Sequence, residues 1–487
     1  MMRVIAAGRV ARLVGDFPRD PAYKGLAEAL RVLITDGRVP VGVRLPSERE
    51  LTEALDVSRT TVTRAYAELR EHGYVTSRQG SGTVASLPST PGLRSDHLLP
   101  PGDLPEDKID LTCAAPLAGP GVLAAYEKAV TELPAYLAGT GYYPSGLPVL
   151  REAVAASYDE RGLPTDPDQV MIVPGALAGV SIAARALLDA GARAVVESPT
   201  YPNAIAALRR TGARIVGADV GAGAGDGDGD VAELAAAVEQ VRPRIAYVIP
   251  DFHNPTGHLL DDDGRAQLAR ALRRAGTTAL VDESMAQLGL DVGRMPAPLA
   301  AHAPGAISVG SLSKPFWGGL RVGWVRAPEH LMDRLFRARL SLDLGVPLLE
   351  QLVATELLRS GAALLEHRRD QLRSSRDTAL AAVARHLPEW RATRPLGGLQ
   401  LWCELPEALS SALVPHAARH DVLIAAGPSF APEGGLDRFV RIPFTQPAHV
   451  LADAVERLGL AWQETRADRG SLRQGGPGRR TGPTLVA

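Results

Sequence analysis

The stretch SLSKPFWGGLRVGW, residues 311–324, places a lysine in an apolar, glycine-rich setting. The chain has 53 basic residues, and only Lys24, Lys108, Lys128 and Lys314 are lysines. Because arginine supplies nearly all of the positive charge, a role in surface charge alone is the weaker explanation of Lys314. A lysine, unlike an arginine, can lose its proton and attack a carbonyl to form a Schiff base. We therefore predict that Lys314 is a catalytic, covalently binding residue.

Short apolar runs alternate with amphipathic helical patterns on both sides of this stretch, from about residue 110 to residue 462. The clearest runs are ARAVVES (192–198), RIAYVIP (244–250), TTALVDES (277–284) and AISVGS (306–311). This alternation predicts a parallel sheet covered by helices. Lys314 follows the last run, and side chains at the carboxyl edge of such a sheet point into the ligand crevice.

An aldehyde cofactor such as pyridoxal phosphate needs several further groups around its lysine. Asp282 ends the run TTALV and can pair with a pyridine nitrogen, which keeps the ring electron-withdrawing. Asn254, in NPTG, can donate to the phenolic oxygen, and Tyr201, in SPTYP, can stack on the ring. Each residue alone has an ordinary explanation as a turn, cap or core residue. The combination predicts a pyridoxal phosphate site.

The phosphate of this cofactor needs its own donors. Ser311, Ser313 and Arg321 surround Lys314 in the sequence. The segment VPGALAG (173–179) adds backbone N–H groups at a predicted helix start, where anions bind readily. The predicted phosphate ligands in this segment are Gly175 and Ala176.

The segment from Leu45 to Val84 predicts a small domain with two short helices and a hairpin. Ser47 and Glu50 form a capping box, so a helix starts at Ser47 and ends near Leu55. Ser58 caps a second helix. Its buried stripe is predicted to be Val62, Ala65, Tyr66 and Leu69. The opposite face carries Arg59, Thr60, Thr61 and Arg64, residue types that contact bases and phosphates in the major groove. A hairpin around Gln79–Gly80 places Arg78 near its tip.

This segment resembles the winged helix-turn-helix of the GntR family, with its LPSER-x-L entry, SR-x-TV recognition helix and G-x-G-T wing. The resemblance implies that DNA is faced by Arg44, Ser47, Arg49, Ser58, Arg59, Thr60, Arg64 and Gly80. By their position we add Glu48, Thr61, Tyr66 and Arg78 to the predicted DNA-binding residues.

The order PGA, ESPTY, NPTG, DES, SLSK, LRVGW and VRIPF resembles the fold-type I aminotransferases. The resemblance implies the cofactor roles given above and assigns Arg441, in FVRIPF, to the substrate carboxylate. It also implies that Tyr142 reaches the phosphate of a neighbouring subunit, with Tyr143 as the competing choice. Many relatives carry a tyrosine two or three residues after the Asp282 position, where this chain has Ser284. Two alternatives follow: Ser284 replaces the tyrosine at shorter reach, or the contact is absent. Either one puts efficient transamination in question.

The two parts together resemble the MocR family of transcriptional regulators. The implied fold is an α+β winged helix-turn-helix followed by a large α/β fold-type I domain with a smaller C-terminal α+β subdomain. We predict a DNA-binding domain over 20–86, a proline-rich linker over 87–109, the aminotransferase-like domain over 110–464 and a disordered tail over 465–487. The expected partners are a double-stranded DNA operator, an amine or amino-acid effector and a second copy in a homodimer. The alternative is a working aminotransferase with an accessory DNA-binding domain.

Composition limits the other possibilities. The net charge is −2, so the chain as a whole makes no electrostatic case for nucleic acid. Residues 1–90 carry 13 basic and 10 acidic side chains, an excess of three positive charges that permits an anionic partner there. The two cysteines, Cys113 and Cys403, are too few for a disulfide framework. We find no signal-peptide pattern and no apolar run of about 18 residues, and expect a cytoplasmic protein without a membrane span or a metal site.

Overall fold

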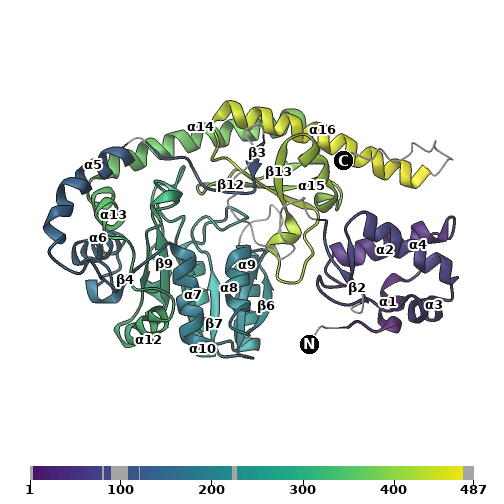
Figure 1. The fold of residues 1–487 in the computed structure, drawn as a ribbon, viewed down its shortest axis with the longest axis horizontal. Coiled ribbons are helices and arrows are strands. Elements are labelled where there is room, and N and C mark those ends of the chain that lie inside the picture. The colour runs from purple at the N-terminus through teal and green to yellow at the C-terminus, as the bar shows by residue number, and fades with distance from the viewer. Residues whose placement is uncertain (1–3, 79–81, 89–107, 120, 222–227, 475–487) are drawn as a thin grey trace.

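The computed structural model describes residues 4–78, 82–88, 108–119, 121–221 and 228–474. The N-terminal unit contains four helices and a hairpin (Figure 1). Its elements are α1 (Ala7–Val14), α2 (Ala22–Thr35), α3 (Glu48–Leu55), α4 (Arg59–Glu71), β1 (Val75–Arg78) and β2 (Gly82–Ala85). Leu26, Leu30 and Leu51 are fully buried in its core. The fold therefore provides α3 and α4 on a packed support.

The predicted helix starts in this unit are confirmed. Ser47 accepts a hydrogen bond from the Glu50 N–H, and Glu50 accepts one from the Ser47 N–H, which completes the capping box of α3. The Ser58 hydroxyl accepts a hydrogen bond from the Thr61 N–H at 3.0 Å and so caps α4. Both helices begin within one residue of the predicted position.

Within the described residues, the large domain has a seven-stranded sheet in the order β4-β10-β9-β8-β7-β5-β6. The strands are β4 (Val170–Val173), β5 (Arg193–Ser198), β6 (Arg214–Asp219), β7 (Ile245–Val248), β8 (Thr278–Asp282), β9 (Ile307–Ser311) and β10 (Gly323–Arg326). The predicted parallel sheet is present, with one antiparallel strand: β10 runs antiparallel to both β9 and β4. The short connection from Ser311 to Gly323 is the physical reason, because a parallel return needs a crossover of about a dozen residues or more.

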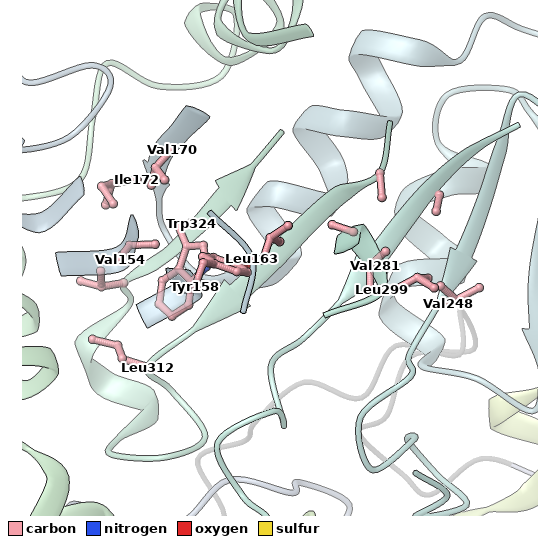
Figure 2. Packing of buried hydrophobic residues seen from close by; sticks show 14 of the residues in the cluster. Val154, Tyr158, Leu163, Val170, Ile172, Val248, Val281, Leu299, Leu312 and Trp324 are labelled. Carbon is pink, nitrogen blue, oxygen red and sulfur yellow. The ribbon is translucent and has the colours of Figure 1, made fainter. Parts of the chain in front are cut away.

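Helices cover both faces of this sheet. One face packs against α7 (Ala176–Leu187), α8 (Pro202–Arg209) and α12 (Glu329–Leu340). The other face packs against α5 (Val122–Glu132), α6 (Pro148–Asp159), α9 (Asp228–Val241), α10 (Asp262–Ala275), α11 (Leu299–His302) and α13 (Leu348–Ser360). Figure 2 shows part of this second layer, in which Trp324 of β10 packs near Tyr158 of α6 and its indole N–H donates to the tyrosine hydroxyl at 3.1 Å. Burial on both faces leaves the carboxyl edge of the sheet as the place for polar groups.

The smaller subdomain has a five-stranded sheet in the order β11-β12-β14-β13-β3. Its elements are β3 (Ile109–Leu111), α14 (Ala362–His386), β11 (Arg391–Ala392), β12 (Gln400–Glu404), α15 (Ser410–Arg419), β13 (Val422–Ala426), β14 (Phe439–Pro443) and α16 (Ala448–Gln474). β3 pairs in parallel with β13, so the start of the large domain is built into the smaller subdomain.

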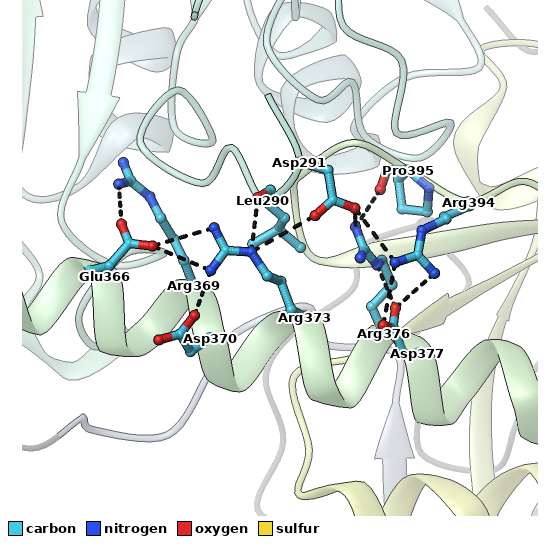
Figure 3. Close-up of polar contacts among 10 residues, drawn as sticks. All are labelled: Leu290, Asp291, Glu366, Arg369, Asp370, Arg373, Arg376, Asp377, Arg394 and Pro395. Atoms are coloured by element: carbon cyan, nitrogen blue, oxygen red, sulfur yellow. Dashed lines mark hydrogen bonds and ion pairs between the residues drawn. The ribbon is translucent and has the colours of Figure 1, made fainter. Parts of the chain in front are cut away.

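Helix α14 ties the two parts of the large domain together (Figure 3). Asp291, in the loop that follows β8, forms an ion pair with Arg376 at 2.7 Å and lies 3.8 Å from Arg373. The Arg369 and Arg373 side chains also donate to backbone carbonyls of residues 287 and 290. These contacts hold the chain downstream of Asp282 against the helix.

The C-terminal end requires a correction. The prediction that disorder begins at residue 465 is wrong for residues 465–474, which continue α16. Thr465 is buried, Arg466 pairs with Glu389 at 2.7 Å, and Asp468 lies 2.9 Å from the His416 ring. Packing on α15 and on the α14–β11 turn therefore extends the helix. Residues 475–487 and most of the predicted linker, 89–107, lie outside the described residues. Among the described residues, no helix has the length and hydropathy needed to span a bilayer.

Candidate cofactor site and DNA-binding surface

Lys314 follows β9 and its side chain is partly buried. Its Nζ donates a hydrogen bond to the carbonyl oxygen of Ala114 at 2.7 Å. Burial lowers the pKa of Lys314 below its ordinary value, and the nearby guanidinium groups of Arg441 and Arg321 act in the same direction. A lysine with a lowered pKa has a larger neutral fraction, and the neutral amine is the form that attacks a carbonyl.

Asp282 ends β8, the strand next to β9, and is buried. Its Oδ1 accepts the backbone N–H of Ser284 at 3.0 Å, and its Oδ2 accepts the hydroxyl of Tyr247 at 2.9 Å. Tyr247 lies on β7 and is fully buried. These two donors hold the carboxylate in place at the end of β8, where it can pair with a ring nitrogen.

Tyr247 is a site residue that the sequence reasoning missed. The run RIAYVIP predicts a core strand and nothing more. The contact follows from the strand register, because β7 and β8 pair with Tyr247 opposite Leu280. Asp282 lies two residues beyond Leu280, so it shares a face of the sheet with Tyr247. Finding this contact requires the strand register, which a single sequence does not provide.

The predicted phosphate donors gather where β4 and β9 end and β10 begins. The Ser311 and Ser313 hydroxyls lie 3.0 Å apart, and both side chains are buried. Arg321 donates to the Pro174 carbonyl at 2.9 Å. Gly175 precedes α7 with φ +88°, and a Cβ at that position would lie 2.9 Å from the Arg321 guanidinium. The close approach leaves the first N–H groups of α7, starting at Ala176, beside the arginine, which is a suitable cradle for an anion.

Arg441 comes from β14 of the smaller subdomain and is buried. It donates to Asn254 Oδ1 at 3.2 Å and to the carbonyl of Thr112. Its guanidinium carbon lies 4.9 Å above the Phe430 ring, and its Nε has no hydrogen-bond partner among the described residues. Burial lowers the pKa of Arg441 to about 10. A buried cation with an unused donor is suited to a carboxylate ligand.

The remaining predicted cofactor residues are Tyr201, Tyr142 with its alternative Tyr143, and Ser284. Tyr201 caps the start of α8 and accepts a hydrogen bond from Asn203 at 3.1 Å, within reach of the charges of Asp282 and Arg441. Tyr142 is 65% exposed and lies on the surface, whereas Tyr143 packs edge-on against Tyr136. Ser284 meets Asp282 through its backbone N–H. Because Tyr142 lies on the surface, it is free to contact a second copy, and the phosphate site of that copy remains its predicted target.

The residues present fit a pyridoxal phosphate group. The amine of Lys314, the carboxylate of Asp282 and the arginines Arg321 and Arg441 act on one another electrostatically. Among the described residues, the Nε of Arg441 has no hydrogen-bond partner, and Gly175 lets the Arg321 guanidinium lie close to the start of α7. The donor set therefore matches the aldehyde, ring nitrogen and phosphate of that group, and a carboxylate beside it.

The predicted DNA-binding residues mostly lie on the outer side of the N-terminal unit. The Arg49 and Arg59 side chains are 86% and 77% exposed. Glu48 accepts the Thr63 hydroxyl at 2.7 Å, which joins the start of α3 to α4. Arg64 lies 3.9 Å over the ring of Tyr23. The starts of both helices thus present arginines from a fixed frame.

Two details limit the predicted DNA surface. The prediction that Tyr66 contacts DNA is wrong, because Tyr66 is 1% exposed and its hydroxyl donates to the Pro46 carbonyl at 2.8 Å. Gly80 lies outside the described residues, and Arg78 is the last residue of β1. Arg44 lies beside the wing, where a Cβ on Gly82 would be 2.6 Å from its Nε.

Comparison with known proteins supports both halves of the chain. Residues 125–458 match the family "Aminotransferase class I and II", and residues 22–84 match "Bacterial regulatory proteins, gntR family". The chain is 33% identical to a 2-aminoadipate transaminase of Thermus thermophilus over 61% of this chain and 75% of that protein. It is 27% identical to the uncharacterized HTH-type transcriptional regulator YdfD of Bacillus subtilis over 91% of this chain and 97% of that protein.

Two further relatives add detail. The chain is 26% identical to the probable rhizopine catabolism regulatory protein MocR of Rhizobium meliloti over 82% of this chain and 85% of that protein. Among solved structures, the α-aminoadipate aminotransferase LysN from Thermus thermophilus, complexed with N-(5′-phosphopyridoxyl)-L-leucine, superposes with a TM-score of 0.67. It is 30% identical, and the match covers 74% of this chain and 94% of that chain.

Proposed function

The chain belongs to the class I and II aminotransferase family and carries a gntR-type domain, the architecture of MocR-type regulators, and we propose that it regulates transcription in response to a ligand of its cofactor site. The observation that carries the proposal is that one chain contains both a gntR-type domain and an aminotransferase domain. Arginines at the starts of α3 and α4 suit DNA, and Lys314, Asp282 and Arg441 suit a cofactor and a carboxylate.

The cofactor is pyridoxal phosphate. When bound, it supplies an aldehyde for covalent capture of amines and an electron-withdrawing ring. In our proposal Lys314 forms the covalent link, Asp282 holds the ring-nitrogen proton and Tyr201 covers the ring. Ser311, Ser313, Arg321 and the start of α7 bind the phosphate. Asn254 turns its carbonyl oxygen toward Arg441, which leaves the amide nitrogen to donate to the phenolic oxygen.

The effector class follows from Arg441. A planar guanidinium binds a carboxylate through two parallel hydrogen bonds. Burial of Arg441 strengthens its preference for a carboxylate over a neutral group. We therefore propose an effector with both an amine and a carboxylate, such as an amino acid. Such an effector changes DNA binding only by the difference between its affinities for two arrangements of the domains.

The proposal includes a cytoplasmic location, because that is where the operator DNA lies. The experiment that tests the function measures binding of the protein to the operator region upstream of its own gene. Affinity and footprint are measured with and without pyridoxal phosphate, and then with an amino-acid panel. A ligand-dependent change in either quantity is expected. If the protein binds the operator tightly and selectively, and neither the cofactor nor any amino acid changes the affinity or the footprint, the proposed ligand sensing is rejected.

A working aminotransferase is the second candidate, favoured by the 33% identity to a transaminase and by the presence of Arg441. Ser284 counts against it, because its hydroxyl reaches less far than the tyrosine hydroxyl found in relatives. Sustained conversion of an amino-acid and keto-acid pair, at many turnovers per protein molecule, decides for the enzyme. We expect at most slow turnover.

We propose that the chain acts as a homodimer through an apolar surface on α5 and the segment after it. The exposed apolar side chains there are Leu123 (71%), Val130 (53%), Leu137 (70%) and Tyr142 (65%). Large exposed apolar side chains that gather on one surface are a mark of protein interfaces. The same surface would place Tyr142 against a second copy, where it reaches the partner's phosphate site.

Replacing Leu123 and Leu137 with aspartate is expected to convert the dimer to a monomer at micromolar concentration, because two charges would be buried in the interface. Sedimentation or light scattering measures the mass. The matched control is Leu460→Asp on α16, whose leucine is 50% exposed away from that surface. A dimer that survives the double substitution would place the interface elsewhere.

Replacing Tyr247 with phenylalanine is expected to weaken binding of pyridoxal phosphate about tenfold. The hydroxyl donates to a carboxylate, and such a bond contributes about 1.5 kcal/mol. Absorbance titrations with pyridoxal phosphate measure the affinity. Tyr158→Phe is the control, since Tyr158 is equally buried but bonds Trp324.

A further inference from the structure

Among the described residues, the DNA-binding domain contacts the large domain mainly at residues 431–438, which we call the docking loop, and also at Ala408. Gly37 follows α2, and a Cβ on it would lie 3.0 Å from the Glu433 carbonyl oxygen. A Cβ on Gly435 would lie 3.5 Å from the Asp36 carbonyl oxygen. Glycines on both sides let the two backbones approach closely, which larger residues would prevent.

An ion pair reinforces this contact. Arg31 of α2 places Nη1 3.8 Å from Oδ2 of Asp437 and 3.5 Å from the Ala408 carbonyl. Asp437 is buried, and its Oδ1 accepts the Ser410 hydroxyl at 2.9 Å and the Ser411 N–H at 2.7 Å. A buried carboxylate is costly without a nearby cation. Arg31 therefore gives the contact a chemical specificity beyond shape.

Both ends of the docking loop are held by the cofactor site. Phe430 immediately precedes the loop, and its carbonyl accepts the N–H of Thr200, the neighbour of Tyr201, at 2.8 Å. Arg441 follows the loop by three residues and lies over the Phe430 ring at 4.9 Å. The two residues that bound the loop therefore touch each other, at the group that would bind an effector carboxylate.

We infer that the docking loop is an interaction surface for the DNA-binding domain of the same chain, and that a carboxylate on Arg441 changes the docking. The inference rests on the proposed function. A carboxylate competes with the Thr112 carbonyl for the guanidinium and forms the stronger, two-pronged bond. Moving the guanidinium alters its contact with Phe430, and the loop then shifts relative to Arg31 and Gly37.

The docking itself is tested first on the full chain without ligand. Hydrogen exchange is measured for wild type, Arg31→Gln and the control Arg38→Gln. Arg38 carries the same charge just after α2 but pairs with Asp36 instead of Asp437. At least tenfold faster exchange is expected over 431–438 and 32–37 in Arg31→Gln, and wild-type exchange in Arg38→Gln. Unchanged exchange in Arg31→Gln would overturn the docking.

The coupling is tested with two probes that differ in one group. N-(5′-phosphopyridoxyl)-isoamylamine lacks a carboxylate, and N-(5′-phosphopyridoxyl)-L-leucine carries one on an otherwise identical frame. The leucine adduct alone should change exchange over 431–438 and 32–37 in wild type and Arg38→Gln, and over 431–438 alone in Arg31→Gln. Calorimetry shows whether each probe binds. A bound adduct that leaves 32–37 unchanged in wild type would overturn the coupling.

Two other outcomes have distinct meanings. If neither probe binds, the proposed cofactor function fails, while the ligand-free comparison of Arg31→Gln with wild type still decides the docking. If wild-type exchange over 431–438 rises on dilution, the docked domain belongs to a second copy, and docking within one chain is overturned. Exchange that is independent of protein concentration is expected, because all the contacts above lie within one chain.

Discussion

Replacing Lys314 with alanine abolishes covalent capture of pyridoxal phosphate and removes the cofactor-dependent change in DNA affinity. The alanine leaves no amine near the carboxylate of Asp282, and the other three lysines lie elsewhere in the sequence. Borohydride reduction followed by mass spectrometry measures the covalent link, and the visible absorbance of the bound cofactor provides a second readout. DNA binding without cofactor should stay at the wild-type level, because the N-terminal unit has its own core.

Lys128→Ala is the matched control, since Lys128 is half-exposed and pairs with Glu356 on the surface. This control should label like wild type. Labelling should also depend on pH. Burial lowers the pKa of Lys314, so the neutral amine is present at lower pH than for an ordinary lysine. Capture should therefore rise with pH, with a midpoint below that of an ordinary lysine. Full labelling of Lys314→Ala would assign the link to another lysine.

Local signals in the sequence carried much of the fold. The capping box at Ser47 and the cap at Ser58 involve residues three apart, so they depend on little beyond the adjacent chain. The strands that end near Asp282 and Lys314 were also predictable, because a strand buried on both faces is a continuous apolar run of adjacent residues. The signal for each of these features therefore lies within a short stretch of sequence.

Features that depend on distant contacts were not predictable. The Tyr247–Asp282 bond needs the register of two strands, and the hold of Arg441 on the Thr112 carbonyl joins residues 329 positions apart. The continuation of α16 depends on Arg466 meeting Glu389. Tyr66 shows the opposite failure: its place in the apolar stripe of α4 indicated burial, and its polar hydroxyl was nevertheless assigned to DNA.

The site also explains how a chain with aminotransferase chemistry can serve as a sensor. Lys314, which would hold the cofactor, and Arg441, which would hold an effector carboxylate, both donate to carbonyls of the segment 112–114. That segment follows β3, the first strand after the linker to the DNA-binding domain. A cofactor on Lys314 and a carboxylate on Arg441 would compete with these carbonyls for the two cations. We therefore expect such ligands to loosen the segment next to the linker, in addition to changing the docking loop.

Replacing Arg59 with glutamine is expected to weaken operator binding by about tenfold to a hundredfold. Arg59 is the first residue of α4, 77% exposed, and lies 3.9 Å from Glu48, which orients it from the side. An arginine that donates two hydrogen bonds to a guanine contributes about 1–3 kcal/mol of base discrimination. Affinity for the operator and for single-base variants is measured by fluorescence anisotropy at a fixed salt concentration.

The control is Arg70→Gln at the other end of the same helix, where Arg70 donates to the Ser77 hydroxyl at 3.0 Å. Equal loss in both variants would mean that general charge, and not the start of α4, drives binding. The salt dependence separates the two roles of Arg59. A base contact relaxes specificity at one position with little change in the salt slope, whereas a phosphate contact weakens all sequences alike and lowers that slope by about one. Because the first residues of a recognition helix are the ones that reach base edges in the major groove, and Arg59 begins α4, the base contact is the expected result.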